Sequence, residues 1–278
     1  MALLAGAGVG ELRLTGARHN CSHYRATLAD GRTVFAKVAS GETGQVFGAE
    51  ARGLRWLAEA GAVPVPEVLG WDEAMLVVSW VPGEAPDAAA AERFGRDLAR
   101  MHASGAERFG APWPGFIASL PLDNDGPAAD WPGWYAARRV LPYLRRAADA
   151  GTLSQAQVRV VEAVVDRIGE LGGQAEPASR IHGDCWSGNV LWSGGRGWLI
   201  DPAAHGGHRE SDLAMLDLFG APYLDRILAG YRETSPLAAG WRARVPLHQL
   251  HPLLVHACLF GSGYAESVAS AARAALKA

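Results

Sequence analysis

The sequence predicts an α+β, bilobal protein in which a small β-rich N-terminal lobe with one helix precedes a larger, mostly helical C-terminal lobe. Strand-like runs separated by turn signals fill the first 80 residues, and helical periodicity dominates from residue 88 onward. Between them, "VPGEAPD" is the most linker-like segment of the chain. We therefore expect an N-terminal lobe over 1–80, a C-terminal lobe over 81–278 and a hinge at about 79–84.

The N-terminal lobe is predicted to contain a β-hairpin over 22–40, where "SHYRATLA" and "TVFAKVAS" flank the turn signal "DGR". Apolar residues then recur at helical spacing over 43–61, and Gly61 is suited to end that helix. Two further strands are expected within 63–72 and 74–83. These elements make the lobe β-rich with a single helix.

The C-terminal lobe is predicted from a series of helical patterns. They cover residues 89–104, 130–151, 154–171, 211–220 and 252–276. Between the third and the fourth lies the polar segment "RIHGDCWSGNVLW", residues 180–192. Two short strands are expected at 190–193 and 197–201, so this polar segment leads into a predicted hairpin.

Composition and charge limit the classes of partner. The formal net charge of −3 gives no electrostatic support for nucleic-acid binding. The three cysteines are too few and too scattered for a disulfide framework, and the N-terminus lacks the basic region of a signal peptide. No apolar run is long enough to span a bilayer. We expect a cytoplasmic monomer or weak dimer without a membrane or nucleic-acid partner.

The polar segment has a residue spacing that suits phosphoryl transfer. His182, Asp184 and Asn189 are spaced as in a kinase catalytic loop, and Asp201 follows two short strands later. The Asp184 carboxylate is suited to take the proton of a hydroxyl nucleophile. The Asn189 amide and the Asp201 carboxylate offer the hard oxygen ligands that Mg²⁺ prefers. A β-hairpin would bring Asp201 back beside Asn189.

Lysine is rare in this chain and occurs only at Lys37 and Lys277. Lys37 lies in the apolar strand "VFAKVAS", where its ammonium group could hold the phosphates of a nucleotide. Glu50 lies on the following predicted helix, on the face suited to pair with Lys37. A lysine in a strand, a glutamate on the next helix, the HxDxxxxN segment and a later aspartate together indicate an ATP-dependent phosphotransferase.

Structural interpretations of the same residues are also open. Asp184 could cap a turn, and Lys37 could be an edge-strand lysine that reaches solvent. Trp186 would either pack in the core or present its ring to a ligand. His182 is better interpreted as a hydrogen-bonding residue beneath the loop than as a proton carrier.

Two other functions compete with phosphoryl transfer. A metal hydrolase could take zinc ligands from His182, Asp184, His205 and His208, since "HGGH" places two histidines at i and i+3. That interpretation leaves the strand lysine, the helix glutamate and the loop asparagine unexplained. The non-enzymatic alternative is a nucleotide-binding pseudokinase. The presence of all four expected polar residues argues against it, namely Lys37, Asp184, Asn189 and Asp201.

Three longer segments resemble a known family. "HGDCWSGNVLW", "LIDPAAHGGHRESDLAM" and "QLHPLLVHACLFGSGY" are similar to the fructosamine kinase family (ketosamine-3-kinases), and the resemblance runs from about residue 14 to 264. That family belongs to the aminoglycoside- and choline-kinase-like enzymes with a protein-kinase-like fold. The resemblance implies ATP and Mg²⁺ as cofactors and a small-molecule or protein-attached ketosamine as substrate.

The resemblance implies that Asp184 is the catalytic base. It makes Asn189 and Asp201 the magnesium ligands, and Lys37 with Glu50 the pair that anchors the phosphates. Family members phosphorylate the 3-hydroxyl of sugars attached to amines through a ketoamine, and the product then sheds the sugar. We therefore expect deglycation repair on ribulosamine or fructosamine substrates. An aminoglycoside or choline-type phosphotransferase is the alternative within this group.

The resemblance also implies contacts to the sugar and to adenine. Trp186 and His256 would face the sugar, and His256 could donate a hydrogen bond to a sugar hydroxyl. The hinge backbone at Ser79, Trp80 and Val81 would meet the adenine. The nucleotide loop, "LTGARHNCSHYRATL", departs from the kinase pattern because it lacks GxGxxG.

Overall fold

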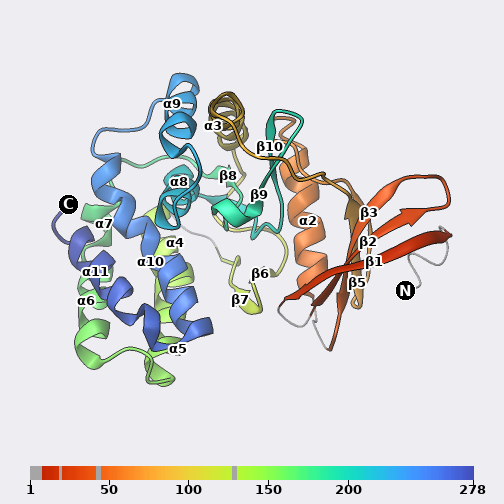
Figure 1. Ribbon diagram of the computed structural model, residues 1–278. Helices are drawn as coiled ribbons and strands as arrows, with labels where there is room; N and C mark the ends of the chain where they lie inside the picture. Colours follow the sequence, from red (N-terminus) through yellow and green to blue (C-terminus); the bar gives the residue numbers. More distant parts are fainter. Residues whose placement is uncertain (1–7, 19–20, 42–44, 127–129) are drawn as a thin grey trace.

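The computed structural model describes residues 8–18, 21–41, 45–126 and 130–278. An antiparallel sheet with one helix forms the N-terminal part, and a larger helical part follows (Figure 1). The predicted α+β, bilobal fold is therefore confirmed.

The N-terminal sheet has five strands in the order β1-β2-β3-β5-β4, and all neighbouring strands are antiparallel. The strands are β1 (Val9–Arg18), β2 (Cys21–Leu28), β3 (Thr33–Ala39), β4 (Val68–Trp71) and β5 (Met75–Ser79). The predicted hairpin corresponds to β2 and β3. Its turn places Gly31 at φ 83°, a left-handed conformation that glycine adopts without steric cost.

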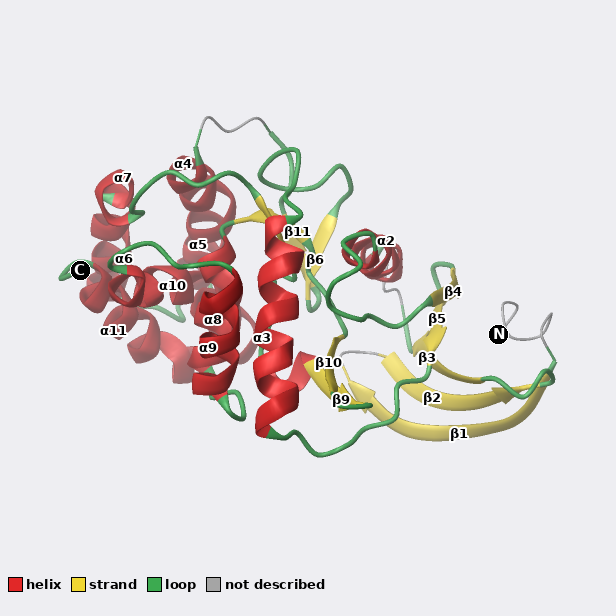
Figure 2. Ribbon diagram, turned by 90° about the horizontal axis from the view of Figure 1, so that it is seen from above, coloured by secondary structure: helices red, strands yellow, loops and turns green. Residues whose placement is uncertain are grey.

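Helix α2 (Val46–Ala58) covers one face of this sheet. Leu54 of the helix packs against Leu76 of β5 in one buried cluster. Lys37 of β3 pairs with Leu76 across the two strands, so its side chain shares the face that α2 covers. Figure 2 shows α2 between the sheet and β6 (Gly115–Ile117), which it also contacts.

Helices dominate the C-terminal part. They are α3 (Ala88–Ala103), α4 (Trp131–Tyr135), α5 (Leu141–Asp149), α6 (Gln155–Asp166), α7 (Ile168–Leu171), α8 (Arg209–Leu218), α9 (Leu224–Thr234), α10 (Trp241–Phe260) and α11 (Ala265–Ala275). A π-helical turn over Ala136–Val140 joins α4 to α5. None of the helices within the described ranges is long and apolar enough to cross a membrane.

Three two-stranded antiparallel sheets lie among the segments that connect these helices. Strand β6 pairs with β7 (Leu120–Leu122), β8 (Ser179–Ile181) with β11 (His205–Gly207), and β9 (Val190–Ser193) with β10 (Arg196–Leu199). The two predicted strands after the polar segment correspond to β9 and β10.

The structure differs from the predicted elements at several places, three of which follow. Helix α9 was not expected, and it packs closely on α3, where a Cβ atom on Gly95 would lie 2.0 Å from the carbonyl oxygen of Ile227. The helix expected over 252–276 is divided at Gly261, which has φ 82° and ψ −160°. The expected nucleotide loop forms the arms of the β1–β2 hairpin, and residues 19–20 lie outside the described ranges.

Candidate active site

Asp184 lies in the loop that follows strand β8. Gly183 precedes it at φ 80°, and a Cβ atom there would lie 2.3 Å from the carbonyl oxygen of Ala203, so the turn requires glycine. Asn189 Nδ2 donates to Asp184 Oδ2 (2.8 Å) and to the Asp184 carbonyl oxygen (2.9 Å). The amide of Asn189 thereby fixes the direction of the Asp184 carboxylate.

Asp201 returns beside Asn189 because β9 and β10 form a hairpin, as the sequence predicts. The backbone N–H of Ile200 donates to the carbonyl oxygen of Asn189 (3.0 Å), which holds the two ends of the hairpin together. Asp201 has a φ of 53°. A non-glycine residue in the left-handed region costs about 1–3 kcal/mol, and such residues are concentrated at functional sites.

Lys37 forms a buried ion pair with two carboxylates. Its Nζ atom lies 2.8 Å from both carboxylate oxygens of Glu50 and 2.8 Å from Asp201 Oδ1. Burial alone would lower the pKa of Lys37, but Asp201 and Glu50 outweigh it and hold that pKa above its ordinary value.

The two carboxylates that share Lys37 have pKa values shifted in opposite directions. Burial raises the pKa of Glu50, whereas Lys37 outweighs burial at Asp201 and lowers the pKa of that carboxyl. One ammonium group cannot neutralise two carboxylates, so Asp201 keeps its charge more readily than Glu50 does. Asp201 is therefore the carboxylate that is more readily available to a cation in its charged form.

Asp184 and His182 have environments that suit different tasks. Burial raises the pKa of Asp184 to about 7, although the hydrogen bond from Asn189 acts in the opposite sense. Burial lowers the pKa of His182 and keeps the ring neutral. Its Nδ1 accepts from the Asp184 backbone N–H (3.2 Å), so Nε2 carries the proton and donates to the carbonyl oxygen of Ile200 (2.9 Å). His182 thus braces the loop from beneath, as its structural interpretation expects.

Asp212 anchors the same loop, and the sequence reasoning missed it. This buried side chain on α8 accepts hydrogen bonds from the backbone N–H groups of His182 (2.7 Å) and Gly183 (3.0 Å). His102 of α3 lies 3.1 Å away through Nε2. The sequence signal that could have indicated this role is an aspartate within the apolar pattern "SDLAMLDL". An aspartate on the buried face of a helix needs hydrogen-bond partners from elsewhere in the fold.

The two residues expected to face the sugar belong to one row of aromatic rings. The Trp186 ring lies over Gly188, where a Cβ atom would be 2.2 Å from it. Phe219 stands between Trp186 (ring centroids 6.1 Å apart) and His256 (5.0 Å). His256 Nδ1 donates to the carbonyl oxygen of Pro252 (2.7 Å), and burial lowers the pKa of the ring. Its Nε2 is therefore an acceptor, which corrects the expectation that His256 donates to a sugar hydroxyl.

An apolar cavity adjoins Lys37 beside the expected hinge. Its lining includes Phe35, Leu54, Leu76, Val78, Val81, Leu191 and Ile200. The N–H groups of Ser79 and Trp80 already donate to backbone carbonyl oxygens of other segments (2.9 and 3.2 Å). Within the described residues the N–H of Val81 takes part in no backbone hydrogen bond. Of the three hinge N–H groups, only that of Val81 is therefore available to adenine, together with the backbone carbonyl groups of the hinge.

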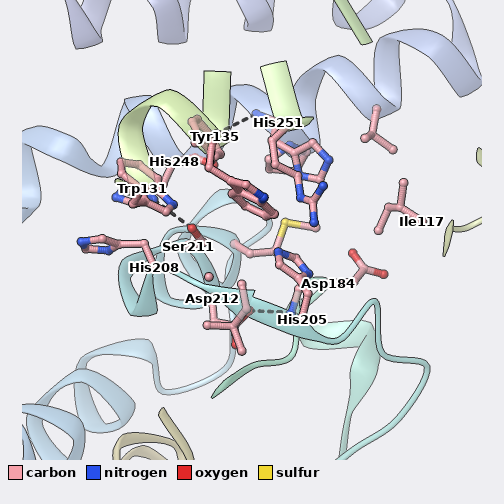
Figure 3. Close-up of a pocket in the computed structure, with 18 of the residues that line it drawn as sticks. Ile117, Trp131, Tyr135, Asp184, His205, His208, Ser211, Asp212, His248 and His251 are labelled. Atoms are coloured by element: carbon pink, nitrogen blue, oxygen red, sulfur yellow. Dashed lines mark hydrogen bonds between the residues drawn. The ribbon is translucent and has the colours of Figure 1, made fainter. Parts of the chain in front are cut away.

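Asp184 lies between two further cavities. The first contains Lys37, Asn189 and Asp201 together with Trp186. The second extends on the other side of Asp184 and has aromatic and histidine side chains around it (Figure 3). A side chain shared by both cavities is in a position to contact groups bound in either one.

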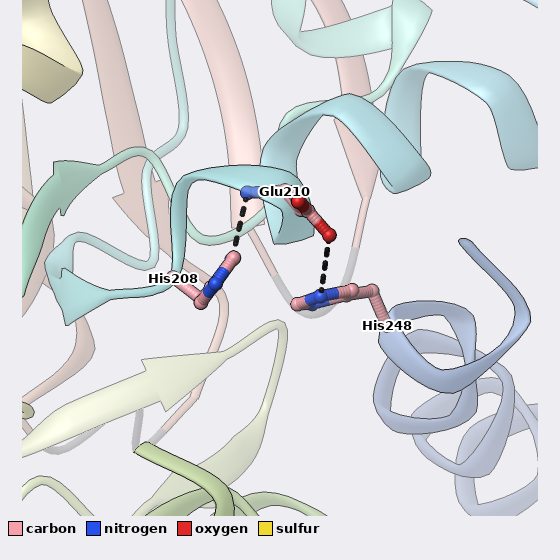
Figure 4. Close-up of side chains that lie close together, drawn as sticks. All are labelled: His208, Glu210 and His248. Atoms are coloured by element: carbon pink, nitrogen blue, oxygen red, sulfur yellow. Dashed lines mark hydrogen bonds and ion pairs between the residues drawn. The ribbon is translucent and has the colours of Figure 1, made fainter. Parts of the chain in front are cut away.

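The metal-hydrolase interpretation is not supported. Among the described residues, the only group of three or more potential metal ligands is His208, Glu210 and His248, and it lacks the other three members of the expected zinc set (Figure 4). Arg244 donates to both Glu210 oxygens (2.6 and 2.9 Å). The carboxylate is therefore already neutralised by a cation, which disfavours a metal there.

Comparisons with known proteins identify the family of this chain. A family model described as fructosamine kinase matches residues 13–278. The chain belongs to the fructosamine kinase family. A ketoamine kinase proposed for Klebsiella aerogenes is 34% identical over 236 residues, which cover 83% of this chain and 81% of the relative. The crystal structure of a proposed fructosamine-3-kinase from Thermobifida fusca YX-ER1 is 54% identical, with a TM-score of 0.95 over 99% of this chain and 96% of that one.

More distant structures show the same fold. A thermostable mutant of the aminoglycoside phosphotransferase APH(4)-Ia, in a ternary complex with ADP and hygromycin B, has a TM-score of 0.68 at 17% identity over 98% of this chain and 97% of that one. This fructosamine kinase family member therefore has the protein-kinase-like fold. Membership of the family makes it an ATP-dependent phosphotransferase, which confirms the enzyme class predicted from the sequence.

Proposed function

We propose that the protein transfers the γ-phosphoryl group of ATP to the 3-hydroxyl of a ketosamine of the ribulosamine or fructosamine type, free or attached to a protein. The observation that carries this proposal is the place of Asp184. Its carboxylate is shared by the cavity that contains Lys37, Asn189 and Asp201 and by the aromatic and polar cavity on its other side. A phosphate donor and a polyhydroxyl acceptor would thus meet at one carboxylate.

Asp184 would act as the general base in this reaction. Its carboxylate accepts the proton of the acceptor hydroxyl while that oxygen forms a bond to the γ-phosphorus, and the bond to the leaving ADP oxygen breaks. A pKa near 7 suits a base that operates around neutral pH, and it results from burial. Lys37, held by Glu50, would keep the donor phosphates in place.

The residues that would hold magnesium fit that ion. Asn189 donates from Nδ2 to Asp184, and Asp201 accepts from Lys37 through Oδ1. Within the described residues Asn189 Oδ1 and Asp201 Oδ2 take part in no hydrogen bond, so each side chain keeps one hard oxygen free. Bound Mg²⁺ would neutralise the charge of the phosphates at this position.

The adenine would lie in the apolar cavity next to the hinge. Ser79, Trp80 and Val81 border that cavity, and Val81 has an N–H group without a backbone partner among the described residues. This arrangement supports lobes over 1–80 and 81–278 that meet at a hinge of about 79–84. The expected cytoplasmic location and the monomeric or weakly dimeric state stay predictions.

The acceptor sugar would lie against Trp186 and His256. Aromatic rings commonly pack on the apolar faces of sugars, and the row formed with Phe219 borders both cavities at Asp184. The 3-phosphorylated product would release the sugar from the amine, so the reaction would serve deglycation repair. The relatives proposed to be ketoamine and fructosamine kinases support this substrate over an aminoglycoside or choline.

A coupled assay of ADP release tests the substrate class. The panel contains a ribulosamine, a fructosamine, an aminoglycoside and choline, with Asp184→Asn as the matched control for turnover that does not use the base. We expect ketosamine-dependent ADP release in the wild type and a loss of roughly 10²- to 10⁴-fold in the variant. Turnover of the aminoglycoside without turnover of either ketosamine would overturn the proposed substrate and leave only the kinase fold.

A further inference from the structure

The cavity on the far side of Asp184 gathers buried polar atoms that have no hydrogen-bond partner. Four of the residues that carry such atoms line this cavity, namely Trp134, Arg139, His248 and His251. His248 Nε2 lies 3.4 Å from a Glu210 oxygen and is accounted for by that ion pair. Trp134 Nε1, Arg139 Nε and His251 Nε2 remain. Since buried polar atoms without partners are rare in folded proteins, their concentration around one cavity points to an absent ligand.

Arg139 is the most unusual of the three. Its side chain is fully buried on the π-helical turn between α4 and α5, and π-turns frequently occur at functional sites. Its Nη1 and Nη2 atoms donate to the Asp123 carbonyl oxygen and to Asn124 Oδ1 (both 2.6 Å), and both acceptors are neutral. No carboxylate of the described residues forms an ion pair with it. The cation therefore lacks a counter-charge, and its Nε–H is left without an acceptor.

The neighbouring groups complement one another chemically. The guanidinium group of Arg139 lies 4.3 Å from the centroid of the Trp134 ring, which brings the two partnerless N–H donors together. His205 donates from Nδ1 to the carbonyl oxygen of Ala203 (2.7 Å), so its Nε2 is an acceptor. The His205 ring lies beside that of Trp134, with centroids 5.5 Å apart. Donors and acceptors thus border one space, and hydroxyl groups, which both accept and donate, satisfy both kinds.

Figure 3 shows how this space relates to the reaction. Asp184 and His205 lie on one side of the cavity, and Tyr135 and His251 lie on the other. A sugar that places one hydroxyl at Asp184 has its next hydroxyls within a few ångströms of that point. Those hydroxyls would lie in the cavity, and the amine end of the bound substrate would extend outward past Trp186.

We propose that Arg139, Trp134 and His251 form a subsite for the distal hydroxyls of the acceptor sugar, those on the carbons beyond the phosphorylated position. The proposal rests on the proposed function and adds the groups that recognise the sugar chain. Arg139 and Trp134 donate to a distal hydroxyl oxygen. His251, on α10, forms a hydrogen bond to a distal hydroxyl through Nε2. The subsite makes the enzyme select acceptors that carry a hydroxyl at the far end of the chain.

The test compares a ribulosamine of a small amine with its 5-deoxy analogue, which keeps the 3-hydroxyl and loses the distal one. A hydrogen bond to a charged, buried donor predicts that wild-type kcat/KM falls by roughly 10- to 100-fold on the deoxy substrate. Arg139→Lys and Trp134→Phe should each bring the ratio of kcat/KM for the two substrates toward one. The removal of the hydroxyl also changes the ring forms of the free sugar, but this change is the same for every enzyme variant and cancels in the comparison.

Arg196→Lys is the matched control. Arg196 Nε is also buried without a partner, but Arg196 lies outside this cavity and its Nη2 pairs with Asp97 (2.9 Å). We expect this variant to keep the wild-type substrate ratio, and KM for ATP to change little in all three variants. A wild-type ratio near one, which requires no variant to fold, would overturn the subsite. So would an unchanged ratio in both cavity variants. If neither ketosamine is phosphorylated at all, the proposed function itself fails.

Discussion

Replacement of Asp212 by asparagine should damage the catalytic loop without touching any reacting group. The carboxylate accepts from His182 N–H and Gly183 N–H at 2.7 and 3.0 Å, and His102 lies 3.1 Å away. The amide of an asparagine has only one acceptor oxygen, and its NH₂ group would face a backbone N–H. Hydrogen bonds to a charged group contribute about 1.5–3 kcal/mol each, so loss of one of the two loop contacts should lower the free energy of unfolding by about 1.5–3 kcal/mol.

Turnover should fall as well, because the same contacts set the position of Asp184. A displacement of about 1 Å at a reacting group costs on the order of 100-fold in rate. Urea denaturation and the ADP-release assay measure the two effects. The control is Asp217→Asn on the same helix, since Asp217 is exposed and its side chain bonds only to Gln249 Nε2 (3.1 Å) among the described residues. If Asp212→Asn behaved like this control in both measurements, the anchoring role would be refuted.

Three further predictions concern the metal, the sugar and pH. Asp201→Ala should abolish magnesium-dependent binding of ATP in calorimetry, and an unchanged affinity would contradict its role as a ligand. Trp186→Ala should raise KM for a ketosamine far more than KM for ATP, and equal changes would remove Trp186 from the sugar site. Burial keeps the pKa of His205 and of His251 well below its usual range, so both stay neutral in the folded protein while the unfolded chain binds protons below about pH 6.5. The two rings should therefore destabilise the fold as pH falls below 6.5, by about 3 kcal/mol between pH 7.5 and 5.5, whereas Asp184, whose pKa burial raises, acts in the opposite sense. The urea midpoints of the wild type and of a variant with His205→Gln and His251→Gln isolate the contribution of the rings, and an equal pH dependence in both proteins would show that the rings are not held neutral.

The sequence was informative where the determining interactions are local. The β2–β3 hairpin has a turn signal between two alternating runs, and the β9–β10 hairpin follows from short strands that flank glycines. The spacing from Asp184 to Asn189 lies within one loop, so its chemistry could be interpreted before the fold was known. The lysine and glutamate of the N-terminal lobe followed from the periods of one strand and one helix.

Other parts depend on contacts that are distant in sequence. The first half of α10 was missed because Pro246 and Pro252 lie inside that helix, and proline normally ends a helix. Helix α9 is held by close packing on α3, which no local pattern reveals. Asp212 and Arg139 were missed for a related reason. Each is a single charged residue in a helix, and such a residue usually points to solvent unless distant segments enclose it.

The ion pair between Lys37 and Asp201 joins side chains that are 164 positions apart. A nascent chain that ends before residue 201 can contain every strand of the N-terminal sheet. It still lacks the Asp201 carboxylate, which is one of the two that pair with Lys37. The complete ion-pair group of Lys37, Glu50 and Asp201 therefore exists only after both parts of the protein have folded and docked, whereas Lys37 and Glu50 can already pair within the N-terminal part. Recovered kinase activity after dilution from denaturant consequently reports assembly of the whole chain, whereas far-ultraviolet circular dichroism also responds to either part folded alone.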